Sequence, residues 1–104
     1  MALLPEFFPG LSGFEWDEGN AEKIRRRHRV TPIEAEQALL NRPVVVRGDP
    51  DHSALESRYY SLGRTDAGRA LIIVFTIRGP LVRVISARPM SRKERRLYDQ
   101  TKRA

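Results

Sequence analysis

The chain has 104 residues, of which 40% are hydrophobic and 31% charged, and this length gives room for one domain with one core. Because no apolar run approaches 18 residues, the sequence predicts no membrane-spanning helix. The absence of cysteine excludes disulfides, thiol catalysis and sulfur-bound metals, and it fits a cytoplasmic protein. Sixteen of the nineteen basic residues are arginine and the net charge is +6, which favours a polyanion bound through bidentate guanidinium contacts. An acidic protein partner would satisfy the same charge.

The first 13 residues, Met1 to Gly13, combine two prolines and two glycines with apolar residues and have neither a helical nor a strand period. We expect an arm that is either mobile or laid on the surface. Residues 14–104 are expected to form the single domain.

A short strand is predicted at Phe14-Glu15-Trp16-Asp17, where apolar and acidic residues alternate. Asp17 is a plausible N-cap for a helix over Glu18 to His28. Acidic residues near its start and Arg25 to Arg29 near its end suit the helix dipole.

A second helix is predicted from Pro32 to about Asn41. Thr31 and Glu34 have the spacing of a capping box, and Pro32 stands at the first helical position. Pro43 closes this helix.

The remainder predicts four strands joined by short turns, followed by a helix from the capping box at Ser91 and Glu94 to about Thr101. The strands are expected at Val44 to Arg47, Glu56 to Leu62, Arg69 to Ile77, which should be central, and Leu81 to Arg88. Hairpin-length turns imply antiparallel pairing. The fold class is therefore α+β, with an antiparallel sheet of about four strands, two N-terminal helices and one C-terminal helix.

Strand alternation would place Val82, Val84, Ser86 and Arg88 on one face of the last strand. Ser86 and Arg88 could then hold a phosphate beside the first amides of the helix at Ser91. Alternatively, Ser86 fills a small core position and Arg88 covers the sheet edge.

Two further arginines lie near strand ends. Arg69 opens the central strand, and antiparallel pairing through Gly79-Pro80 would bring it to the end that carries Arg88. Arg58 shares a face with Glu56, as in an ordinary surface ion pair or a catalytic pair.

Histidine is the residue type whose ordinary pKa lies near neutrality, so His28 and His52 are candidates for proton transfer, although His28 could equally cap a helix end. No residue spacing suits a metal, and neither a phosphate-binding glycine loop nor a nucleophile elbow occurs. RNA supplies its own nucleophile, the 2′-hydroxyl. An arginine-rich protein could therefore cut it without metal or cofactor by positioning the strand and stabilising negative charge.

Several blocks, in this order, resemble the BrnT toxin family, small bacterial ribonucleases of type II toxin-antitoxin systems whose fold is similar to RelE toxins. The resemblance runs from Phe14 to about Gln100. Its blocks are Phe14-Glu15-Trp16-Asp17, Arg27-His28-Arg29-Val30, His52-Ser53 with Glu56, Arg58 and Tyr59, Ile85-Ser86-Ala87-Arg88, and Lys93-Glu94-Arg95-Arg96 with Tyr98.

This resemblance implies a metal-independent endoribonuclease that inhibits translation and growth. Its antitoxin would carry a ribbon-helix-helix domain, and operator DNA would be bound only through that antitoxin. The implied roles are phosphate binding by Arg69 and Arg88, proton transfer by His28 and orientation by Ser86. Arg27 is a further active-site candidate, and Arg58 is either catalytic or a partner of Glu56. Arg92, Lys93 and Arg96 are expected to bind RNA, and the helix from Ser91 to Thr101 to contact the antitoxin.

The family usually reads Lys-His-Gly-Val where this chain has Arg27-His28-Arg29-Val30, and Asn20 and Ile24 also depart from its pattern. Glycine adopts the left-handed helix-ending conformation without steric cost, whereas Arg29 does not. These changes favour an alternative, a catalytically inactive module that binds RNA or antitoxin. A DNA-binding repressor ranks last, because no helix-turn-helix spacing is present.

Overall fold

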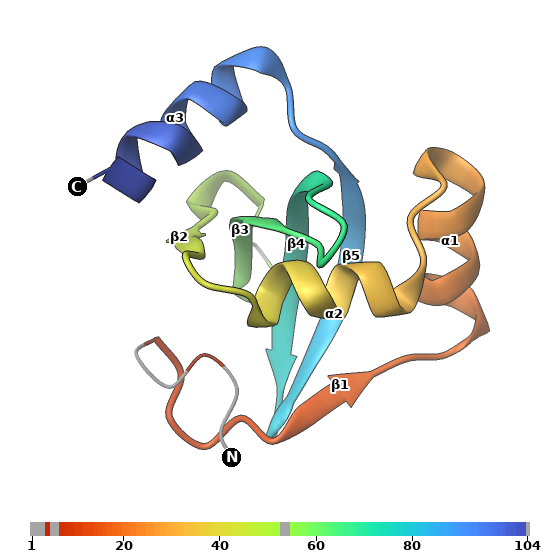
Figure 1. Cartoon of the computed structure of the whole chain (residues 1–104). Helices are drawn as coiled ribbons and strands as arrows, with labels where there is room; N and C mark the ends of the chain where they lie inside the picture. Colours follow the sequence, from red (N-terminus) through yellow and green to blue (C-terminus); the bar gives the residue numbers. More distant parts are fainter. Residues whose placement is uncertain (1–3, 5–6, 53–54, 104) are drawn as a thin grey trace.

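The computed structural model describes residues 4, 7–52 and 55–103, and for His52, Lys102 and Arg103 the backbone only. Positions 1–3 and 5–6 of the predicted arm therefore lie outside the described residues, as does Ser53. The described residues form one sheet and three α-helices (Figure 1). The elements are β1 (Gly13–Glu15), α1 (Glu18–His28), α2 (Pro32–Leu40), β2 (Val45–Gly48), the 3-10 helix η1 (Pro50–His52), β3 (Arg58–Arg64), β4 (Ala70–Arg78), β5 (Leu81–Pro89) and α3 (Arg92–Arg103).

The sheet has the strand order β1-β5-β4-β3-β2, which places β4 in the centre as predicted. The pairs β2–β3, β3–β4 and β4–β5 are antiparallel, as predicted. Short turns join β3 to β4 and β4 to β5, whereas residues 49–57, which include η1, connect β2 to β3. The expectation of about four antiparallel strands is wrong in one respect. β1 joins the sheet as a fifth strand, parallel to β5. No hairpin turn connects β1 with β5, so turn signals in the sequence could not predict this pairing.

A bulge interrupts the alternation along β5. Val74 of β4 pairs with Ser86 but the next residue, Phe75, pairs with Val84, so Ile85 is the extra residue. The predicted shared face of Val82, Val84, Ser86 and Arg88 is therefore wrong. Val82 and Val84 belong to the core on one side of the sheet, whereas the pairing of Ser86 and Arg88 places them on the other.

Two apolar clusters cover opposite faces of the sheet. The larger cluster lies under α1 and α2 and includes Ile24, Leu39, Ile73 and Phe75. The smaller one brings Tyr98 of α3 together with residues of β2, β3 and β4. Figure 1 shows α3 extending beyond the upper end of the sheet, so a large part of this second face is not covered by a helix.

The described part of the N-terminal segment packs against the domain. Leu4 and Leu11 are buried in the larger cluster. The Phe8 ring meets the Tyr59 ring edge-on at 4.8 Å, and the Ser12 N–H donates to the Pro80 carbonyl at 2.8 Å.

Both N-terminal helices begin with the predicted caps. Asp17 and Asn20 form a reciprocal capping box on α1, and Thr31 and Glu34 form one on α2. The Asn20 amide also donates to the carbonyls of Glu15 and Val84, at 3.0 and 3.1 Å, and so ties α1 to β1 and β5.

Helix α1 ends at Arg29 in the left-handed conformation, with φ 54° and ψ 39°. Glycine adopts this conformation without a Cβ clash, so Arg29→Gly is expected to raise the free energy of unfolding by about 0.5–1 kcal/mol. The thermal midpoint should rise by roughly 3–5 °C, measured by circular dichroism. Arg29→Ala is the control, because it removes the same charge and keeps the Cβ. An equal rise in both variants would attribute the gain to charge instead.

Candidate functional site

The sheet face opposite α1 and α2, called here the open face, carries several predicted site residues. Cross-strand pairing defines three neighbouring rows on it. These are Arg58 with Thr76 and Arg83, then Arg47 with Tyr60, Val74 and Ser86, then Val45 with Leu62, Ile72 and Arg88. Paired residues project to the same side, so Arg58, Ser86 and Arg88 share this face in successive rows.

Tyr60 is the residue of this face that the sequence interpretation did not single out. It is half-buried and lies in the same row as Ser86, with Val74 between them. An aromatic ring on an open sheet face is a platform on which RNA bases stack. The predicted alternation from Glu56 to Leu62 already put Tyr60 on the face of Arg58, and this signal could have identified it.

Arg88 is held by the capping box of α3. Its two terminal nitrogens donate to the two Glu94 oxygens at 2.8 and 2.9 Å, and one of them also reaches the Pro89 carbonyl at 3.2 Å. Glu94 accepts the Ser91 N–H at 2.7 Å and its own N–H donates to the Ser91 hydroxyl at 3.2 Å, so two amides at the start of α3 are used by the capping box. The hydrogen bond to Glu94 raises the pKa of Arg88.

Hydrogen bonds from Arg88 lower the pKa of Glu94 from its ordinary 4.5 to about 2, although burial opposes the shift. A depressed carboxyl pKa gives stability that is complete above about 4.5 and is lost as pH falls towards about 2. We expect a loss of about 1–2 kcal/mol, reduced by solvent because the Arg88 side chain is 39% exposed. Urea unfolding across this window measures it. Glu94→Gln should be less stable than wild type above the window, with the difference shrinking on acidification. A constant difference would contradict this assignment.

Of the predicted RNA-binding residues, Lys93 and Arg96 line a hollow on α3 together with Glu94, the partner of Arg88. Arg92 is exposed on the same helix. Leu97 also lines this hollow and is 43% exposed. The beginning of α3 therefore places cations and an apolar side chain beside Arg88.

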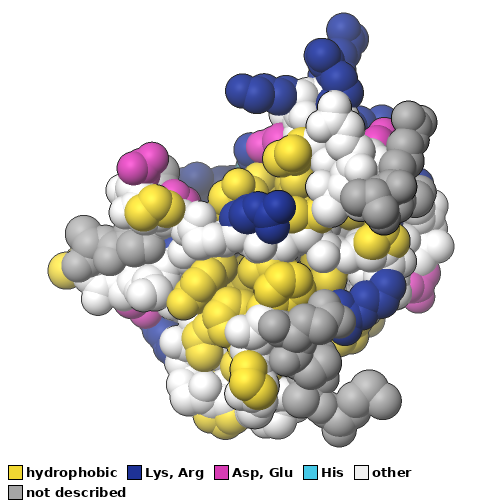
Figure 2. All heavy atoms as spheres, turned by 90° about the vertical axis from the view of Figure 1, so that its left-hand side faces the viewer, with side chains coloured by type: hydrophobic (Ala, Val, Ile, Leu, Met, Phe, Trp, Pro, Cys, Tyr) yellow, Lys and Arg dark blue, Asp and Glu magenta, His cyan; other side chains and the backbone are white. Residues whose placement is uncertain are grey.

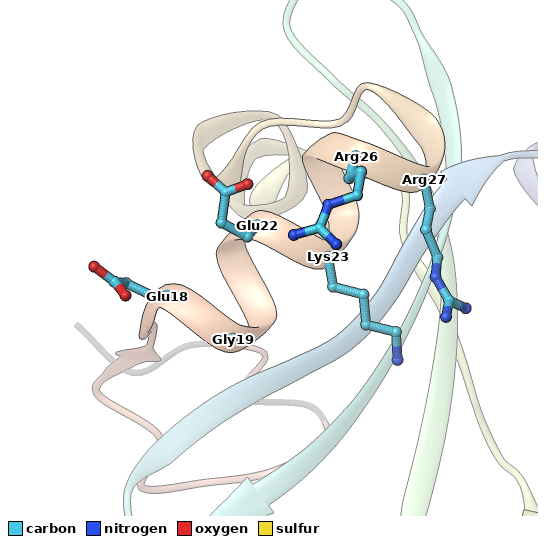
Figure 3. A pocket seen from close by; sticks show the side chains of 6 residues that line it. All are labelled: Glu18, Gly19, Glu22, Lys23, Arg26 and Arg27. Carbon is cyan, nitrogen blue, oxygen red and sulfur yellow. The ribbon is translucent and has the colours of Figure 1, made fainter.

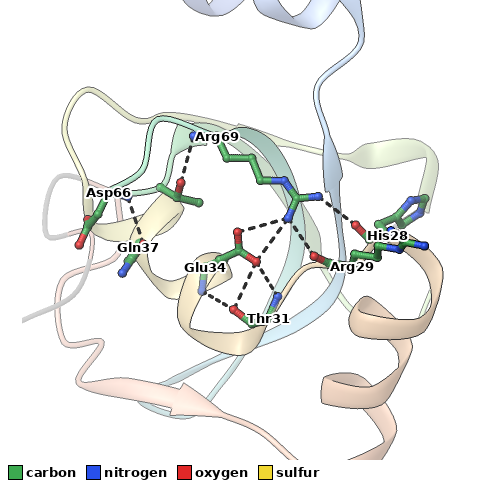
Figure 4. Close-up of polar contacts among 8 residues, drawn as sticks. His28, Arg29, Thr31, Glu34, Gln37, Asp66 and Arg69 are labelled. Carbon is green, nitrogen blue, oxygen red and sulfur yellow. Dashed lines mark hydrogen bonds and ion pairs between the residues drawn. The ribbon is translucent and has the colours of Figure 1, made fainter.

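Arg69 lies on the other side of the sheet, among α1 and α2 (Figure 4). Its terminal nitrogens donate to the His28 carbonyl at 3.0 Å and the Arg29 carbonyl at 2.9 Å, and they lie 3.2–3.3 Å from the Glu34 carboxylate. The guanidinium thus binds carbonyls at the end of α1 and the capping residue of α2. Burial opposes the shift, but hydrogen bonds from Thr31 and Arg69 lower the pKa of Glu34.

The structure does not bring all six predicted catalytic residues together. Arg27 and His28 lie in the last turn of α1, and Arg27 is exposed. The His28 imidazole points away from Arg69 in Figure 4. These two residues and Arg69 therefore form a group on the helix-covered side, separate from Arg58, Ser86 and Arg88. The side chain of His52 lies outside the described part.

At the end of the open face near β1, carboxylates neutralise the arginines Arg78 and Arg83. Arg83 contacts Glu15 at 3.0 Å and Asp17 at 2.9 Å. Arg78 contacts Glu15 at 3.3 Å and Glu56 at 3.5 Å, which gives Glu56 a partner other than the predicted Arg58. The hydrogen bond from Arg83 is the main cause that lowers the pKa of Asp17.

Figure 2 shows one side of the molecule, with hydrophobic side chains gathered at its centre and lysine or arginine side chains above and among them. Within the described ranges, no helix is long and apolar enough to cross a membrane. The same ranges contain no group of three or more acidic or histidine side chains suited to a metal ion.

Arginines, a tyrosine and a serine on a sheet face that a helix covers only in part are the surface chemistry of proteins that bind nucleic acid. The family model for the ribonuclease toxin BrnT of type II toxin-antitoxin systems matches residues 16–94. Because this match covers most of the chain, the chain belongs to the BrnT family, as its sequence blocks predicted. Membership in this family implies a ribonuclease toxin with an RNA target and an antitoxin partner. No curated protein matches the chain.

Proposed function

We propose that this toxin is a metal-independent endoribonuclease that cuts RNA on the open face. The 2′-oxygen of the substrate forms a bond to the adjacent phosphorus while the bond from phosphorus to the 5′-oxygen breaks. The 2′-hydroxyl passes its proton to solvent water and the leaving 5′-oxygen takes one from solvent water, so the proton count balances. The products are a 2′,3′-cyclic phosphate and a 5′-hydroxyl. Cutting of mRNA in the cytoplasm would stop translation and growth.

The observation that carries this proposal is the arrangement of Arg58, Ser86 and Arg88 in three successive rows, with Tyr60 among them. Arg58 and Arg88 stabilise the charge that develops on the phosphoryl oxygens. Ser86 orients the strand, and Tyr60 stacks on a base.

Arg88 can serve this role while Glu94 holds it. A guanidinium has five N–H groups, and the two terminal nitrogens of Arg88 reach three acceptors. Glu94 fixes the guanidinium plane, so less freedom remains to be lost when a phosphate binds.

Arg27, His28 and Arg69 take other roles in this proposal. Arg69 stabilises the junction of α1 and α2 through the His28 and Arg29 carbonyls. Arg27 and His28 lie at the end of α1, so the proposal assigns them to substrate binding instead of the reacting phosphate.

The test uses purified, antitoxin-free protein and a labelled single-stranded RNA in excess EDTA, with and without ribosomes. The expected products carry a cyclic phosphate, and a substrate with 2′-deoxyribose at the cleaved position should stay intact at that bond. Intact RNA under both conditions contradicts the proposal, as does cutting of the deoxy-substituted bond.

The bidentate contact of Glu94 with Arg88 favours a second candidate, an inactive module that binds RNA or antitoxin. In that case the role of Arg88 on the open face is to hold α3 through Glu94. This candidate predicts salt-sensitive RNA binding without product.

We further propose that the fold is related to that of RelE toxins and that the partner is an antitoxin that binds α3. The antitoxin would carry a ribbon-helix-helix domain, contact α3 near exposed Leu97, and provide the only link to operator DNA. Pulling down a co-expressed antitoxin with wild type and Leu97→Ser tests this contact, and equal recovery would contradict it.

A further inference from the structure

A second cationic surface lies on α1, outside the open face. A hollow of about 460 Å³ runs along the exposed side of this helix. It is lined by Glu18, Gly19, Glu22, Lys23, Arg26 and Arg27. Its acidic residues lie near the start of the helix and its basic residues near the end (Figure 3).

The three cations of this hollow, called here the α1 ridge, are Lys23, Arg26 and Arg27. They follow the i, i+3, i+4 spacing that places side chains on one face of a helix. Figure 3 shows the Lys23 and Arg27 head groups extending in the same direction, whereas the Arg26 guanidinium is turned towards the side of Glu22.

The ridge differs from the sheet arginines in its charge balance. Arg69, Arg83 and Arg88 each contact at least one carboxylate at 3.2 Å or less. Among the described residues, Lys23, Arg26 and Arg27 have no ion pair. The positive charges of Arg26 and Arg27 interact favourably with the C-terminal end of the helix dipole. These side chains remain available to bind an external polyanion.

A smaller hollow connects the ridge with β5. Lys23 lines it together with Arg83, Val84 and Ile85, and Ile85 is the bulge residue. β1 pairs with β5 only as far as Arg83, and Ser86 on the open face follows the bulge directly. A chain bound on α1 therefore has a short path across this edge to the open face.

We infer that the α1 ridge binds phosphates of the RNA strand next to the segment that is cut, an inference that rests on the proposed function. Lys23, Arg26 and Arg27 contact the backbone without reading sequence, and they guide the strand over the β5 bulge towards Ser86. RNA is favoured over an acidic protein, because the ridge leads by way of Lys23 and the bulge towards the proposed cutting site.

The experiment measures binding of a 2′-O-methylated single-stranded oligonucleotide, which lacks the nucleophile, as a function of salt. Lys23→Gln/Arg26→Gln/Arg27→Gln should weaken binding about tenfold or more near 150 mM salt and lower the log–log salt slope by about 2. Arg26→Gln alone should lower the slope by about 0.7. It keeps the test decisive if the triple variant does not fold.

Arg25→Gln is the matched control. Arg25 lies on the same helix but lines a different hollow with Asp17 and Trp16, and its replacement removes the same charge. It should leave the slope nearly unchanged. If Arg25→Gln and Arg26→Gln lowered the slope equally, RNA binding would depend only on the net charge of the protein, and the inference would be overturned.

Unchanged RNA binding by the triple variant would also overturn the inference, even if wild type cuts RNA. Loss of antitoxin binding with RNA binding intact would assign the ridge to the protein partner and overturn it too. If wild type binds the oligonucleotide through the ridge but cuts no RNA, the proposed catalytic function fails while the ridge is retained as a phosphate-binding site.

Discussion

Replacing Arg88 with alanine is expected to lower the rate of RNA cutting by about 10²–10³-fold, the usual effect of removing one donor that stabilises transition-state charge. Replacing an arginine at an exposed strand end ordinarily changes stability by only about 0.5 kcal/mol. The contact with Glu94 revises that expectation, since its loss leaves the α3 capping carboxylate without its cation. We expect a cost of about 1 kcal/mol, which leaves most molecules folded. Single-turnover cutting and chemical unfolding of the same preparation measure both effects.

Arg69→Ala is the comparison that separates the two arginines. Arg69 donates to two carbonyls and to Glu34, so its removal is expected to destabilise the protein by about 2–3 kcal/mol. Cutting per folded molecule should fall far less than in Arg88→Ala. The opposite ranking, with Arg69→Ala folded but inactive and Arg88→Ala active, would move the reaction to the helix-covered side.

Gly63→Ala is expected to destabilise the protein by about 3 kcal/mol or more. A Cβ at Gly63 would overlap the Ala38 carbonyl oxygen, so α2 could not keep its present distance from β3. The neighbouring backbone cannot rotate away as a flexible side chain could, and overpacking of this kind is costly. Thermal and urea unfolding should both show the loss.

Gly48→Ala provides the matched control, because an added Cβ at Gly48, at the end of β2, meets nothing within 4 Å. Its stability should stay within about 0.5 kcal/mol of wild type. If the two alanine variants were equally stable, α2 would not pack on β3 as closely as the structure shows.

Local signals in the sequence predicted most elements. Asp17 starts α1 and the capping box of Thr31 and Glu34 starts α2, as predicted, because a cap depends on residues close together in sequence. The apolar run from Arg69 to Ile77 became the central strand β4. Short turns gave the antiparallel pairs β3–β4 and β4–β5 correctly.

The remaining features depend on contacts between distant residues. The parallel pairing of β1 with β5 follows no local turn, and the bulge at Ile85 reverses the alternation in β5 without a glycine or proline to mark it. Ser86 and Arg88 were therefore correctly predicted on one face of the strand end, but Val82 and Val84 were wrongly predicted on the same face. The contacts of Arg69 with α1 carbonyls could not be predicted, since they span about forty residues of sequence.

RNA can be cut on the open face only if the RNA strand binds there. The most direct measurement is a backbone NMR titration of the wild-type protein with a 2′-O-methylated RNA oligonucleotide that it cannot cut. We expect the largest shift changes at Tyr60, Val74, Ser86 and Arg88, with little change at Ala35 and Ala38, which are buried residues of α2 itself. Changes confined to α2, with the open face unaffected, would show that the RNA does not bind where cutting is proposed.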